Sequence, residues 1–87
     1  MISSGQTTIG TATPVQIDGA SASASILHIA NVDNTKTMYL GGSNVTTSNG
    51  LPLFKLERLT IDLQPGEQLF AISSDTGHTV AWLRQVL

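Results

Sequence analysis

The hydrophobic and polar positions along this chain of 87 residues alternate in short runs, which predicts strands rather than helices. The clearest alternation is Leu59-Thr60-Ile61-Asp62-Leu63, where every second side chain is apolar, as in a strand with one face in water. A second alternating run covers residues 79–86 and places Trp82 among the apolar positions of one face. Further short strands are predicted at 6–9, at 15–17, where apolar and polar residues alternate, and at 69–72, which is apolar on both faces.

The middle of the chain holds the most hydrophobic run, Ile26–Val32, which is apolar on both faces and therefore typical of a central strand. Met38–Leu40 is the next apolar run and follows the polar turn Asp33–Lys36. We predict that these two strands form a hairpin. Leu51–Phe54 is also apolar but contains Pro52, which cannot donate to a strand ladder, so this segment is either an edge strand or a loop.

The number and spacing of these elements predict the fold class. Seven or eight short strands, about ten residues apart and separated by turn signals, indicate an all-β domain: a small β-sandwich or a jelly-roll-like barrel of antiparallel strands. Gln64-Pro65-Gly66-Glu67 has the composition of a type II turn. Residues 1–14 are rich in Ser, Thr and Gly, and we interpret them as an N-terminal arm before a single domain at 15–87. Deleting this arm is expected to impair assembly more than folding.

The low fraction of charged residues suggests that this domain assembles with other protein chains. Charged residues make up 11% of the sequence, against about 25% in an ordinary soluble domain, and charge is depleted at the centres of protein interfaces. A domain this short buries a limited core and usually needs disulfides, a metal or oligomerisation. Cysteine is absent, so we expect the additional stability to come from contacts between copies of the chain.

The same composition argues against several kinds of partner. The four basic residues are scattered along the chain, whereas binding to phosphate backbones needs them clustered, so no nucleic acid is expected. No apolar run approaches the length needed to span a membrane. The first residues lack the basic and apolar regions of a signal peptide, so we expect synthesis in a cytoplasm.

Candidate chemistry is sparse. His78 follows Asp75 in a polar run and is interpreted as a solvated turn residue, whereas His28 lies mid-strand and is expected to be hydrogen-bonded on the second sheet face. Asp62 and Glu67 bracket a turn and are expected to be exposed. No nucleophile motif, metal-ligand spacing or phosphate-binding glycine loop occurs. We therefore predict no enzyme activity, no catalytic residue, no cofactor and no metal.

Apolar residues in excess of one small core define a candidate assembly interface. We draw it from the arm, from the proline-containing segment and from the second face of the last strand. Leu53 and Phe54 have an equally favoured alternative, in which they close the core of their own domain. The predicted interface residues are Ile2, Ile9, Leu51, Pro52, Leu53, Phe54 and Leu83.

Several short motifs of the chain are weak singly but moderately specific as a set: Asn31, Met38-Tyr39-Leu40-Gly41-Gly42, Val45-Thr46, Asn49-Gly50-Leu51-Pro52-Leu53 and Leu63-x-Pro65-Gly66-Glu67-x-Leu69-Phe70-Ala71-Ile72. Together they resemble a pattern in small β-sandwich virion proteins of tailed bacteriophages. The resemblance covers about residues 26–83 and is to proteins of the head decoration, head fibre or minor capsid type. Lys55-Leu56-Glu57-Arg58 departs from it, since a more proline-rich link is expected there.

The resemblance implies a non-enzymatic virion protein that acts as a homo-oligomer, with a trimer favoured. The first expectation is a capsid decoration (cement) protein that binds the head surface through the major capsid protein or another virion protein, and is therefore located in the virion. A tail, fibre or baseplate component is the alternative within the same class. A carbohydrate-binding module for host attachment is the alternative from another class.

Overall fold

The computed structural model describes residues 2–17, 23–33 and 35–86. The described residues form strands and turns without a helix, which confirms the prediction of an all-β fold. The strands are β1 (Ile2–Ile9), β2 (Val15–Gln16), β3 (Ser25–Asn31), β4 (Met38–Gly41), β5 (Leu51–Leu53), β6 (Arg58–Leu63), β7 (Phe70–Ser73) and β8 (His78–Val86).

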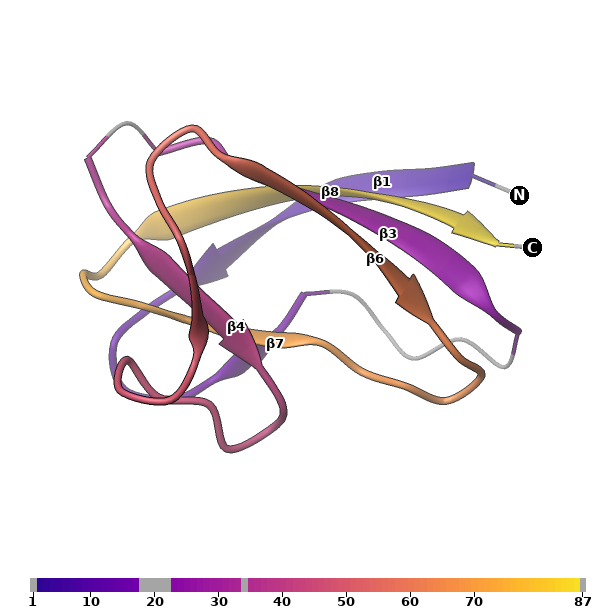
Figure 1. The fold of residues 1–87 in the computed structure, drawn as a ribbon. Helices are drawn as coiled ribbons and strands as arrows, with labels where there is room; N and C mark the ends of the chain where they lie inside the picture. Colours follow the sequence, from indigo (N-terminus) through magenta and orange to yellow (C-terminus); the bar gives the residue numbers. More distant parts are fainter. Residues whose placement is uncertain (1, 18–22, 34, 87) are drawn as a thin grey trace.

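Two antiparallel sheets of four strands lie face to face (Figure 1). One sheet has the order β1-β8-β3-β6 and the other has the order β2-β7-β4-β5. The pairs β1·β8, β2·β7, β3·β6 and β4·β5 are therefore nested, as if one long hairpin had been rolled across two sheets. This strand order is that of an eight-stranded jelly roll, a β-sandwich made of two four-stranded sheets.

The core lies between the sheets and is built from the inward-facing position of each strand. Alternation explains its composition: along β3, the buried side chains are Ser25, Leu27, Ile29 and Asn31, and the residues between them point outward. Trp82 on β8 packs at the margin of the core and remains partly exposed. The buried apolar cluster comprises Ile9, Ile17, Leu27, Ile29, Met38, Leu40, Leu53, Leu63, Leu69, Ala71 and Val80.

The predicted hairpin of Ile26–Val32 with Met38–Leu40 is wrong. β3 pairs with β6 and β8, whereas β4 pairs with β5 and β7 in the other sheet. Because both strands are apolar, each can be central in a sheet, and local pattern does not say which strand lies beside it. The polar turn between them crosses from one sheet to the other.

Residues 2–9, assigned from the sequence to an arm, belong to the sandwich. β1 pairs with β8 over eight consecutive residues, from Ile2↔Gln85 to Ile9↔His78. The Oγ1 of Thr7 also donates to the carbonyl of Ile17, 3.0 Å away. The polar composition arises because β1 is an edge strand whose outward side chains face solvent. The predicted boundary at residue 14 therefore does not separate an arm from the fold.

Two local predictions of turn and edge are confirmed. β5 lies at the edge of its sheet, where a proline such as Pro52 is tolerated. In the predicted type II turn, Gly66 has a φ of 82° and the amide of Glu67 donates to the carbonyl of Gln64 at 3.0 Å. Asp18 and the residues to 22, predicted as a turn and strand lead-in, lie outside the described residues.

Candidate functional site

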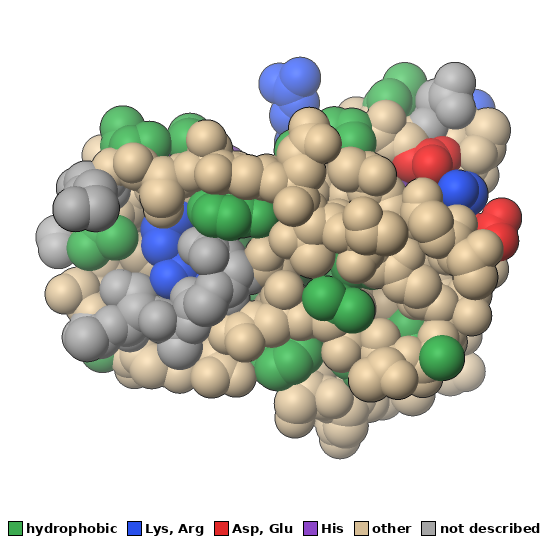
Figure 2. Space-filling view, turned by 180° about the vertical axis from the view of Figure 1, so that it is seen from behind, with side chains coloured by type: hydrophobic (Ala, Val, Ile, Leu, Met, Phe, Trp, Pro, Cys, Tyr) green, Lys and Arg blue, Asp and Glu red, His purple; other side chains and the backbone are tan. Residues whose placement is uncertain are grey.

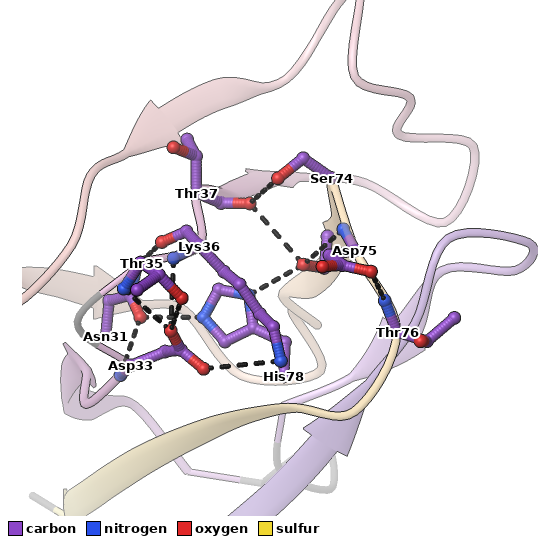
Figure 3. A network of polar contacts seen from close by, with 10 residues as sticks. Asn31, Asp33, Thr35, Lys36, Thr37, Ser74, Asp75, Thr76 and His78 are labelled. Carbon is purple, nitrogen blue, oxygen red and sulfur yellow. Dashed lines mark hydrogen bonds and ion pairs between the residues drawn. The ribbon is translucent and has the colours of Figure 1, made fainter.

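The most connected polar cluster in the described residues is buried at the end of the sandwich where β3 ends and β8 begins (Figure 3). Its centre is His78, whose Nε2 lies 2.6 Å from Oδ1 of Asn31 and whose Nδ1 lies 2.7 Å from Oγ of Ser73. All three side chains are at most 1% exposed. We call these three residues the Asn31 network. Because they come from β3, β7 and β8, the network joins the two sheets.

The orientation of the Asn31 amide is fixed by its other partners. Its Nδ2 lies 3.0 Å from the carbonyl oxygen of Lys36 and 3.1 Å from those of Leu53 and Phe54. Since an amide nitrogen has two hydrogens, one of them is shared between two carbonyls. The opposite atom, Oδ1, accepts from the backbone N–H of Asp33 at 3.1 Å. Only a donor at His78 Nε2 satisfies this arrangement.

The protonation state of His78 follows from the same contacts. Burial lowers the pKa of His78 below the ordinary value of 6.5, and the charge of Lys36 acts in the same direction, whereas the carboxylate of Asp33 opposes both. The ring is therefore neutral at pH 7, with its proton on Nε2 and its Nδ1 free to accept. The hydroxyl of Ser73 then donates to Nδ1, and its oxygen accepts the N–H of Asp75 at 3.1 Å.

The serine, histidine and amide of this network lie in the same order as a nucleophile, its base and an orienting group. Here the arrangement cannot act on a substrate, because Ser73 and His78 are both 0% exposed. The serine oxygen is also occupied by the Asp75 amide. The network therefore stabilises the sandwich and supports no chemistry.

The interpretation of His78 as a solvated turn residue is wrong. The residue is the first of β8 and points inward with Val80, two positions later. Extending the predicted alternation of residues 79–86 by one step would have placed it on the buried face. Asn31 carried the same signal, because it continues the inward series of Leu27 and Ile29.

The turn between β3 and β4 is held by an aspartate. Oδ1 of Asp33 accepts the backbone N–H of Thr35 at 2.8 Å, the Thr35 hydroxyl at 2.9 Å and the N–H of Lys36 at 3.1 Å. Its Oδ2 lies 3.5 Å from Nζ of Lys36. Led by the Thr35 amide, these contacts lower the pKa of Asp33 from 3.8 to about 2. This is the Asx turn expected for the polar segment.

The remaining titratable groups form no further site. His28 is exposed on β3 and its Nδ1 lies 3.0 Å from Oγ1 of Thr60, as predicted for the outer sheet face. Asp62 and Glu67 are exposed at opposite ends of their turn, also as predicted. Within residues 2–17, 23–33 and 35–86, no three His, Asp or Glu side chains come together in a way that could hold a metal ion. The same residues include no helix of a length and hydrophobicity that could cross a membrane.

The predicted assembly interface divides into core and surface. Ile9 is 1% exposed and Leu53 is 6% exposed, so both belong to the core and are removed from the predicted interface. The physical reason is strand alternation, which turns these two residues inward while their neighbours face out. Ile2, Leu51, Pro52, Phe54 and Leu83 are exposed, and their role in an interface stays a prediction.

The outer face of the β1-β8-β3-β6 sheet has a hollow. Ala30 and Ala81 are paired across β3 and β8, and their small side chains leave a depression of about 350 Å³. His28, Arg58, Thr60 and Leu83 are among the residues around it. We call this the Ala30–Ala81 hollow. The face of the molecule drawn in Figure 2 shows few charged side chains.

Comparison with known proteins gives a likeness of fold. No family model matches the chain, and no curated protein matches it. A solved structure described as "Bacillus endospore appendages form a novel family of disulfide-linked pili" is similar, with a TM-score of 0.58 and 13% sequence identity. The alignment covers 100% of this chain and 86% of that chain. At this identity, the match shows a shared fold.

Proposed function

We propose that this chain is a non-enzymatic structural subunit that assembles with copies of itself. The observation that carries the proposal is the exposure of large apolar side chains on a domain whose core is already closed. Six such side chains are more than a third exposed among the described residues: Ile2, Val32, Leu51, Phe54, Leu56 and Leu83. Charged residues make up 11% of the chain. Exposed apolar side chains on a surface with few charges are typical of protein interfaces.

The fold likeness supports the same class of function. The similar structure is described as that of pili, which are assemblies of repeated subunits. Its description names disulfide links, whereas the present chain has no cysteine. Contacts between copies of this chain therefore cannot be disulfides.

Two kinds of assembly follow from different observations. The resemblance to phage virion proteins favours a closed homo-oligomer, a trimer, that decorates a capsid. The fold likeness to a pilus protein favours an open filament of an extracellular appendage. If repeating the rotation between neighbouring copies brings the last copy back to the first, the assembly is a closed ring. If it does not, the assembly is an open filament. We retain the virion surface as the principal proposal and the appendage as the second.

A carbohydrate-binding role has less support from the surface. Such a module needs an exposed platform of aromatic side chains. Of the four aromatic residues, Phe54 is exposed, whereas Tyr39, Phe70 and Trp82 are partly buried on different strands.

Sedimentation velocity of the purified chain, across a hundredfold range of concentration, tests the proposal. Association into a defined oligomer or a growing filament is expected, and negative-stain microscopy separates the two forms. A monomer at every concentration, with no binding to purified capsids, would refute the proposed function.

A further inference from the structure

Two turns of this chain have the same hydrogen-bond pattern. In the turn 54–57, the amide of Glu57 donates to the carbonyl of Phe54 at 3.1 Å, and the amide of Phe54 donates to Oε1 of Glu57 at 2.7 Å. In the turn 64–67, the equivalent distances are 3.0 Å and 2.6 Å, with Gln64 and Glu67 as the partners. The glutamate side chain closes the turn in both cases.

The two turns differ at the third position, where the backbone is left-handed. The turn 64–67 has Gly66 there, with a φ of 82°, and the turn 54–57 has Leu56, with a φ of 59°. Glycine is the residue that this position of a type II turn favours, because a Cβ is strained at positive φ. Among the described residues, Leu56 is the one non-glycine residue with positive φ.

Leu56 gains nothing from its own core in return for this strain. Its side chain is 63% exposed, and that of Phe54 in the same turn is 55% exposed. Leu56 is therefore a strained residue exposed to solvent, whereas the turn 64–67 has a glycine at the same position and avoids the strain. Backbone strain held without a benefit to the fold is typical of functional positions. A contact outside the monomer is the benefit that remains.

The Ala30–Ala81 hollow lies close to this turn along the chain and in space. Arg58, at the hollow, comes two residues after Leu56. The amide of Asn31 donates to the carbonyl of Glu57 at 2.9 Å, which fixes the turn beside the end of β3 that carries Ala30. The hollow has a volume of about 350 Å³ and is open to solvent, so side chains of a neighbouring copy have access to it.

We propose that Leu56 and Phe54 of one copy insert into the Ala30–Ala81 hollow of a second copy. This inference rests on the proposed function of self-assembly and names its contact. The match is apolar, because Lys55 and Glu57 of the inserted turn cancel in charge, whereas Leu56 and Phe54 meet a hollow whose lining includes Ala30, Leu59, Ala81 and Leu83. Since turn and hollow lie side by side on each copy, a two-fold arrangement would allow both contacts at once, whereas a rotated arrangement would continue to a third copy.

Two single variants test the two sides of the contact. Leu56→Asn keeps a side chain of similar size, tolerates positive φ and removes the apolar group. Ala81→Gln fills the hollow from an outward position of β8. Each is expected to weaken self-association at least tenfold in sedimentation experiments, and the melting temperature of Leu56→Asn is expected to equal or exceed that of the original chain. Gly66→Asn is the matched control, because it places the same residue at the equivalent left-handed position of the turn 64–67, where a Cβ would have nothing within 4 Å.

Mixing the two variants gives the decisive measurement. Leu56→Asn retains an intact hollow and Ala81→Gln retains an intact turn, so a mixture is expected to form mixed oligomers that neither variant forms alone. If the original chain associates and both variants associate equally well, this inference is wrong while self-assembly stands. The inference also fails if no mixed species forms, or if Gly66→Asn loses as much association as Leu56→Asn. A monomeric original chain would overturn the proposed function as well.

Discussion

Replacing Asn31 with alanine tests whether the buried polar network holds the two sheets together. The side chain makes five contacts: with the carbonyls of Lys36, Leu53 and Phe54, the amide of Asp33 and the ring of His78. The contacts to Leu53 and His78 are wholly buried, and the other three are partly buried. Alanine removes all five without offering a substitute.

The magnitude follows from what each partner can do afterwards. A buried polar group that is left unsatisfied costs about 1–3 kcal/mol, which applies to the Leu53 carbonyl and the His78 N–H. The three part-buried partners reach water, so each loses about 0.5 kcal/mol, the low end of a net hydrogen bond. The expected loss is about 3.5–7.5 kcal/mol, against a total stability of about 4–13 kcal/mol for a domain of this length. Asn31→Ala should therefore leave a barely folded chain.

Urea unfolding, followed by the fluorescence of the single tryptophan and by circular dichroism, measures this loss. Asn49→Ala is the matched control, because Asn49 accepts one hydrogen bond, from the Thr46 amide at 2.7 Å in an exposed turn. That variant should lose less than about 1 kcal/mol. Equal losses in the two variants would contradict the argument that burial makes the Asn31 contacts costly to remove.

Asn31→Asp separates hydrogen bonding from shape. The carboxylate has the size of the amide but no donor, and it would face the three carbonyl oxygens of Lys36, Leu53 and Phe54. We expect a greater loss of stability than in Asn31→Ala at pH 7, with partial recovery in acid as the carboxyl group becomes protonated. An Asp variant as stable as the original chain would show that the three donor contacts contribute nothing.

Three further predictions concern other parts of the fold. Deleting residues 1–9 should unfold the chain, contrary to the expectation from the sequence, because it removes the eight-residue pairing of β1 with β8 and the buried Ile9; circular dichroism checks this, and a folded product would contradict it. Gly5→Ala should cost about 1–3 kcal/mol by overpacking, since its Cβ would lie 2.8 Å from the Trp82 ring; Gly10→Ala, with nothing within 4 Å, is the control in urea unfolding. The free energy of unfolding should decrease as the pH falls below about 6.5, because the unfolded chain binds a proton at His78 that the folded chain, with its lowered pKa, does not. His78→Gln should remove this step in urea titrations between pH 7 and 5, and a step that persists would assign it elsewhere.

The proposed contact links the stability of the monomer to its association. A leucine in a left-handed turn lowers the stability of the monomer, and a monomer near its stability threshold tolerates only a few such positions. The chain has one among its described residues, and it lies next to the hollow that would receive it. Stability and association should therefore change in opposite directions when this residue is replaced.

The class of fold, most of the strands and the turn at Gly66 could be predicted from the order of the residues. These depend on local physics: alternation of apolar residues at period two, and the positive φ that glycine permits. The sequence also indicated a lack of charge and of cysteine, from which assembly through non-covalent contacts was proposed. Composition misled at residues 2–9, because a polar edge strand and a solvated arm have the same pattern.

The neighbours of each strand and the set of buried polar residues depend on how the whole chain folds. The pairing of β3 with β6 and β8, rather than with β4, is set by how two sheets close over one core, and this is a non-local choice. The same closure brings Asn31 and His78, 47 residues apart, within 2.6 Å. It also places the strained Leu56 beside the hollow between Ala30 and Ala81. Contacts between residues far apart in the sequence depend on the fold of the whole chain, so they cannot be predicted from a local pattern.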